Sequence, residues 1–124
     1  MKPSEMFLPA WKKEYKNYDE AYEAVKGITD QIKLTEIATT APDEFVRCAA
    51  VRKINNQEIL EKIAKNDEEW TVREAAVEKI NNREFLEEIA KNSKEVDVRI
   101  AAVRKISNQE LLEEVAENAG DAYV

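Results

Sequence analysis

The chain offers few of the side chains on which catalytic sites are built. Its 124 residues include no histidine, one cysteine and two glycines. Without histidine there can be no Ser-His-Asp or Cys-His nucleophile system, no imidazole acid–base catalyst and no ordinary zinc site. Gly27 and Gly120 lie outside any phosphate-binding loop pattern. The sequence therefore predicts a protein that is not an enzyme and that holds no cofactor or metal.

Three arginines recur at a constant interval of 26 residues: Arg47, Arg73 and Arg99. On a helical wheel they fall inside an apolar arc, where a guanidinium needs a partner. We expect a structural ladder in which each arginine meets a carboxylate, and a row of phosphate-binding arginines is the alternative. The candidate partner carboxylates are Glu61, Glu87 and Glu113.

The totals of charge and composition restrict the class of partner. The formal net charge of -7 disfavours nucleic acid and anionic membranes, because an acidic field repels another polyanion. The single cysteine, Cys48, rules out an internal disulfide framework, and the N-terminal sequence has no apolar run long enough for a signal peptide or a membrane span. We expect a soluble, cytoplasmic protein.

Nearly the same sequence occurs three times at this interval. The three copies read VRCAAVRKINNQEILEKIAKN from residue 46, VREAAVEKINNREFLEEIAKN from residue 72 and VRIAAVRKISNQELLEEVAEN from residue 98, after a degenerate copy at 20–45. Each copy predicts two short helices, the second of them clearly amphipathic. Two such helices cannot bury their apolar faces alone, so the copies must stack on one another.

The junctions between the two helices carry capping signals. Capping-box spacing predicts that the second helix begins after Asn55, Asn81 and Ser107. Asparagine tolerates the left-handed conformation that commonly follows a helix. The second helices are therefore expected to end at Asn66, Asn92 and Asn118.

The pattern VRxAAVxKI, a turn and xxLxEIAxN resembles the short HEAT-like α-helical repeats, close to the leucine-rich repeat variant group, over residues 20–123. The resemblance implies an all-α fold, a right-handed α-α solenoid of four two-helix repeats within one domain. The expected repeats are 20–45, 46–71, 72–97 and 98–123, with the solenoid reaching residue 124. The resemblance also implies a scaffold for binding another protein. HEAT-like DNA glycosylases suggest nucleic-acid binding as one alternative, and a structural module that stacks end to end is another.

Both ends of the repeat array need a cover. Residues 1–19 are expected to form an N-terminal cap, because aromatic residues recur there at helical intervals. These are Phe7, Trp11, Tyr15, Tyr18 and, just beyond, Tyr22. At the other end, we expect either that Tyr123 and Val124 pack back on Leu112 and Val115 or that two chains bury these flanks together as a homodimer.

The outward face of the predicted second helices becomes steadily more acidic. The charge of four outward positions falls from 0 to -2 to -4 over the last three repeats. In HEAT-like solenoids the second helices line the concave side, so a basic segment of a partner protein is expected to dock there. A solvated surface is the alternative interpretation. The residues of this predicted site are Glu87, Glu88, Glu113, Glu114 and Glu117.

Overall fold

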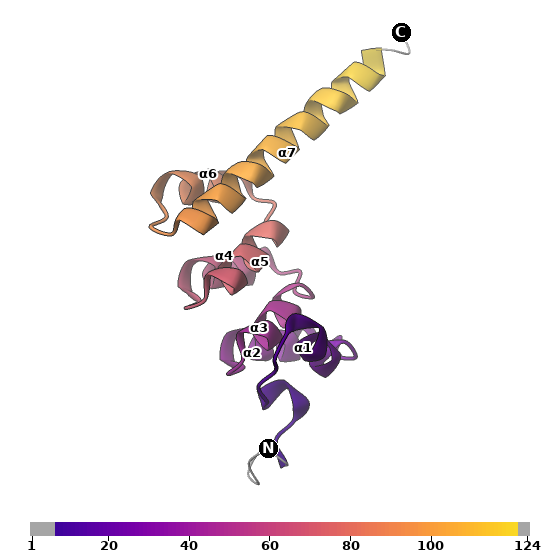
Figure 1. The fold of residues 1–124 in the computed structure, drawn as a ribbon. Helices are drawn as coiled ribbons and strands as arrows, with labels where there is room; N and C mark the ends of the chain where they lie inside the picture. Colours follow the sequence, from indigo (N-terminus) through magenta and orange to yellow (C-terminus); the bar gives the residue numbers. More distant parts are fainter. Residues whose placement is uncertain (1–6, 122–124) are drawn as a thin grey trace.

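The computed structural model describes residues 7–121, and every regular element within that range is helical, which confirms the all-α prediction (Figure 1). A short 3-10 helix, η2, spans Ala10–Lys12. The α-helices are α1 (Tyr18–Val25), α2 (Gln31–Thr40), α3 (Glu44–Val51), α4 (Gln57–Asn66), α5 (Trp70–Lys79), α6 (Arg83–Asn92) and α7 (Val96–Asp121).

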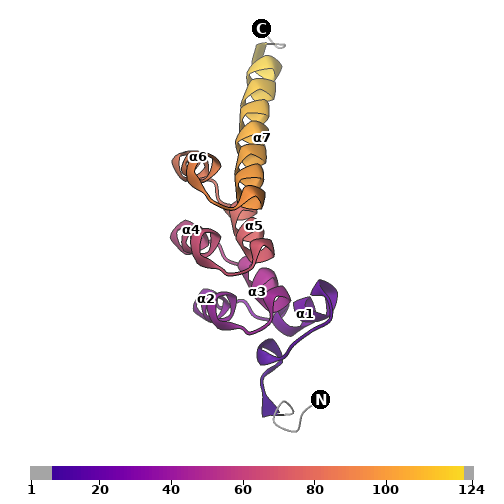
Figure 2. The same cartoon turned by 60° about the vertical axis from the view of Figure 1, so that its left-hand side comes forward.

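The helices lie in two rows. Helices α3, α5 and the start of α7 follow one another in one row, and α2, α4 and α6 form the row beside it (Figure 2). Each helix of the second row packs against the helix that follows it in sequence: α2 on α3, α4 on α5 and α6 on α7. Within the first row α3 contacts α5, and α5 contacts α7.

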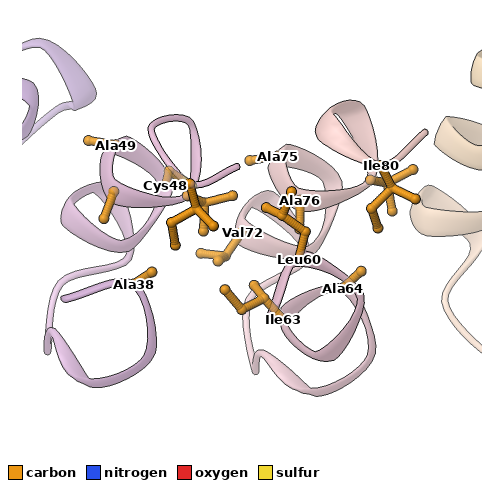
Figure 3. Close-up of a cluster of buried hydrophobic side chains, with 14 of the residues drawn as sticks. Ala38, Cys48, Ala49, Leu60, Ile63, Ala64, Val72, Ala75, Ala76 and Ile80 are labelled. Carbon is orange, nitrogen blue, oxygen red and sulfur yellow. The ribbon is translucent and has the colours of Figure 1, made fainter. Parts of the chain in front are cut away.

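The core lies between the two rows and repeats with the sequence. The second-row helices contribute large aliphatic residues such as Leu60, which is fully buried, and Ile63 (Figure 3). The first-row helices face them with Val72, Ala76 and similar small residues, all buried. Alanine lets two helix backbones approach closely, so the V-x-x-A-A sequence signal marks the packed side of each first-row helix.

The helix ends differ from the predicted ones in two ways. The N-caps of α4 and α6 are Asn56 and Asn82, whose side chains accept hydrogen bonds from the backbone N–H of Ile59 at 3.2 Å and of Phe85 at 3.1 Å. The predicted caps at Asn55 and Asn81 are therefore wrong by one residue, because each junction offers two consecutive asparagines.

The predicted left-handed helix ends are also wrong. Helices α4 and α6 do end at Asn66 and Asn92, but the next residues, Asp67 and Ser93, are extended, with ψ of 140° and 138°. No residue in the described range 7–121 has a positive φ. The extended residue turns the chain directly into the loop before the next first-row helix.

A glutamine from the preceding repeat holds the turn between the two helices of each middle repeat. The Gln57 amide donates to the carbonyl of Lys79 at 3.0 Å, and its oxygen accepts from the N–H of Asn81 at 2.8 Å. The same pair of bonds joins Gln31 to Lys53 and Asn55. One side chain thus satisfies both a carbonyl and an N–H that the end of the helix leaves free.

The last repeat lacks this clamp, and its two predicted helices form one continuous helix. The residue 26 positions after Gln57 is Arg83, which can only donate hydrogen bonds and binds Glu87 and Glu110 instead. Among the described residues 7–121, no side chain of another helix accepts from the N–H of Ser107, so α7 continues through the predicted cap. The predicted separate helix ending at Asn118 is wrong, because the helix extends to Asp121.

Three aromatic residues of the N-terminal segment pack against the hydrophobic core: Trp11 and, only partly buried, Tyr15 and Tyr18. Trp11 is buried against the core, and the Lys33 ammonium lies 4.9 Å from its ring centroid. Phe7 is 89% exposed. The expected aromatic stripe is not continuous, because residues 13–17 are not helical and interrupt the spacing.

Candidate interaction surfaces

Each arginine of the repeating column binds the end of the preceding second-row helix. The Nη1 atoms of Arg47, Arg73 and Arg99 donate to the carbonyls of Ala41, Asp67 and Ser93, at 2.8, 2.6 and 2.6 Å. These carbonyls belong to the C-cap residues, which lack partners within the helix. A cation at a helix C-terminus is also favourable electrostatically. These contacts give the guanidinium groups polar partners within an apolar arc.

The carboxylate partners of the arginines lie in the loops. Arg47 forms a two-point pair with Asp67, with Nε to Oδ2 at 3.0 Å and Nη2 to Oδ1 at 3.3 Å. Arg73 Nη2 lies 3.4 Å from a carboxylate oxygen of Glu95. The predicted pairing with Glu61 and Glu87 is therefore wrong for these two arginines. The side chains point toward the loop carbonyls and away from the outward face that carries the glutamates.

A second column of cations, which was not predicted from the sequence, also binds helix ends. Lys53 donates to the carbonyls of Val25 and Lys26 at the end of α1, at 2.9 and 2.8 Å. Lys79 and Lys105 make the matching bonds one and two repeats later, each at 2.8 Å. Burial lowers the pKa of Lys79. Recurrence at the same interval was the signal that could have revealed these residues.

The structure does not bring the five glutamates of the predicted acidic site into one groove. Glu87 and Glu88 lie on α6, where they pair with Arg83 at 3.2 Å and Lys65 at 3.5 Å. The other three, Glu113, Glu114 and Glu117, are exposed on the part of α7 that extends away from the body (Figure 2). Because α7 does not turn back beside α6, the acidic surface is divided between two places.

A series of exposed apolar side chains runs along α7 without a partner among the described residues 7–121. Six of its apolar side chains are at least half exposed, and we call them the α7 stripe. They are Val96, Ile100, Val103, Leu111, Leu112 and Val115, with exposures between 50% and 69%. At 3.6 residues per turn, the first three lie within an arc of about 60° on the helix and the last three within an adjacent arc of about 100°.

The residues that correspond to Val103, Leu112 and Val115 in the earlier repeats are buried. Leu112 is 69% exposed, whereas Leu60 and Leu86 at the same repeat position are fully buried. Those residues belong to second-row helices that pack against the next first-row helix. The α7 stripe therefore has the composition of a packed helix face and the exposure of a surface. Tyr123 and Val124, expected as one alternative cover, lie outside the described residues.

Comparisons with known proteins identify no family for this chain. No protein-family model, curated protein or solved structure matches the chain. No helix within residues 7–121 is long and apolar enough to cross a membrane. In the same range, no group of three or more histidine, cysteine, aspartate or glutamate residues is placed to hold a metal ion.

Proposed function

We propose that the chain is a HEAT-like α-solenoid that serves as a non-catalytic protein-interaction module, and that it docks through the α7 stripe onto a second copy of itself. The observation that carries the proposal is the set of six exposed apolar side chains along one helix. Soluble monomers rarely expose contiguous apolar surface of this kind unless it binds something.

Charge on α7 favours a second copy in the antiparallel orientation. Residues 96–106 carry one acidic and three basic side chains, whereas residues 107–117 carry four acidic side chains and no basic one. An antiparallel pair places the acidic half of each helix beside the basic half of the other.

The shape of the molecule also permits this pairing. With 26 residues, α7 is about 39 Å long at 1.5 Å per residue. It extends away from the other helices (Figure 2), so the bodies of the two copies would lie at opposite ends of the paired helices. Pairing Ile100 with Val115 of the other copy puts a two-fold axis between residues 107 and 108, which gives a closed, self-complementary interface.

Sedimentation equilibrium on wild type and two matched variants tests the proposal. Wild type is expected to approach twice the chain mass of 14.2 kDa as concentration rises. Leu111→Lys should be monomeric, because the new ammonium lies in the stripe opposite Arg104 of the other copy. The control Ile32→Lys adds the same charge at a residue on α2 that is 83% exposed, and it should still dimerise. Circular dichroism checks that both variants keep their helix content.

Two outcomes would contradict the proposal. A wild-type protein that stays monomeric at millimolar concentration, or a Leu111→Lys variant that still dimerises, would show that the stripe is not the interface. Masses that grow beyond the dimer would instead support the end-to-end stacking alternative, because an antiparallel pair is closed.

A further inference from the structure

The guanidinium of Arg73 is less completely paired than that of Arg47. In the earlier repeat, Nε and Nη2 of Arg47 both bind the carboxylate of Asp67. The residue 26 positions after Asp67 is Ser93, so the corresponding carboxylate is missing beside Arg73. The two sites have the same backbone framework, because each arginine donates Nη1 to the C-cap carbonyl six residues before it.

Burial makes the missing carboxylate consequential. The Arg73 side chain is only 10% exposed, and its Nε atom is buried without a hydrogen-bond partner. Among the residues that the structure describes, Nη2 contacts only Glu95, at 3.4 Å, and the Glu95 side chain is 57% exposed. A buried charged donor without an acceptor is unfavourable, so the site is stabilised by any group that supplies two oxygens along this edge of the guanidinium.

Arg73 lines a cavity. It has a volume of about 320 Å³ and lies between α4, α6 and the loop that leads into α7. Arg73 and Ser93 line it together with two lysines, Lys65 and Lys94. Two glutamates, Glu88 and Glu95, also line it, which leaves three cations against two carboxylates.

We propose that this cavity binds a carboxylate group of a small molecule, in the place that Asp67 occupies beside Arg47. A planar carboxylate matches the two parallel N–H groups of Nε and Nη2 and displaces Glu95 from its long contact. Since Lys65 already pairs with Glu88, Lys94 is the lysine on the cavity wall that favours a second anionic group, so the ligand class is a small dicarboxylate. The site is separate from the α7 stripe, and its occupancy does not depend on dimerisation.

NMR titration of the arginine side chains tests this inference. Succinate and acetate serve as probes, and the Nε–Hε signal of Arg73 is followed while that of Arg47, already paired with Asp67, serves as an internal control. We expect saturable movement of the Arg73 signal alone, with succinate binding more tightly than acetate. Repeating the titration in Leu111→Lys keeps the result independent of the proposed dimer.

Two variants make the test specific. Ser93→Asp supplies the missing internal carboxylate, so it should weaken succinate binding at least tenfold, whereas the control Asn55→Asp adds the same charge at a distant exposed turn and should not. Glu95→Gln removes the competing carboxylate and should tighten binding about two- to five-fold, the range of an exposed ion pair. An Arg73 signal that does not move with either probe, or equal binding in Ser93→Asp and wild type, would overturn the inference.

Discussion

The two-point pair between Arg47 and Asp67 should make a large contribution to stability. The two side chains are 13% and 9% exposed, so removing the charge of one leaves the other buried without its counterion. Breaking a buried pair in this way costs about 3–5 kcal/mol, and the remaining bond from Arg47 to a loop carbonyl favours the lower limit. We therefore expect Asp67→Asn to lower the free energy of unfolding by about 3 kcal/mol.

The expected shift in melting temperature follows from the chain length. At about 2.1 cal/mol/K per residue, the 124 residues give an unfolding entropy of about 260 cal/mol/K, so 3 kcal/mol corresponds to about 12 °C. Thermal melts by circular dichroism measure this, with urea titration as a second assay. The control Glu61→Gln alters the carboxylate that the sequence wrongly favoured and should shift the melting temperature by less than about 2 °C, since surface changes cost little.

A double-mutant cycle separates the pair from other effects. Arg47→Met combined with Asp67→Asn should be less destabilised than the sum of the two single variants, because the second change removes the uncompensated charge. A loss below about 1 kcal/mol for Asp67→Asn, or a Glu61→Gln variant that is equally damaged, would refute the assignment of Asp67 as the partner.

Three further predictions concern buried and junction residues. Burial raises the pKa of Cys48 from 9.0 to about 11, so alkylation of Cys48 at pH 8 should be far slower in the folded than in the urea-unfolded protein, and equal alkylation rates would contradict this. The free energy of unfolding should also fall as pH rises from about 9 to 11, because only the unfolded thiol ionises in that range. Gln57→Ala removes both hydrogen bonds of a turn clamp and should lower the free energy of unfolding in urea by about 1–3 kcal/mol. The control Gln109→Ala loses a single hydrogen bond of 3.3 Å and should lower it less, and the reverse order would count against the clamp. Arg83→Gln restores a side-chain acceptor for the N–H of Ser107 and should interrupt α7 there, so the carbon chemical shifts of residues 105–108 should lose their helical values. Unchanged shifts would mean that the clamp does not decide the turn.

Helix existence could be predicted from the sequence because it depends on local pattern. The spacing of Leu60, Ile63 and Ala64 predicts a helix with one apolar side, and all three residues are buried on α4. The same spacing at Leu112 and Val115 also predicts a helix, and α7 is helical there. What the pattern could not show is whether a turn precedes that helix.

The errors arise where distant residues decide the outcome. The turn between two helices depends on a glutamine more than twenty residues earlier, and Arg83 in that place leaves α7 continuous. The arginine partners were misplaced because Asp67 and Glu95 belong to loops, where helical-wheel reasoning does not apply. The predicted acidic site is divided because α7 is continuous and carries the three C-terminal glutamates away from α6.

Disulfide trapping tests the central claim, antiparallel pairing of two α7 helices, most directly. With the two-fold axis between residues 107 and 108, the two copies of Ser107 lie about one residue apart along the helices, whereas the two copies of Glu114 lie about 13 residues, or roughly 20 Å, apart. Since a disulfide requires Cα atoms within about 7 Å, oxidation should cross-link Ser107→Cys efficiently and leave Glu114→Cys monomeric in a denaturing gel. Cross-linking of Glu114→Cys, or none in Ser107→Cys at concentrations where the mass doubles, would contradict the antiparallel pair.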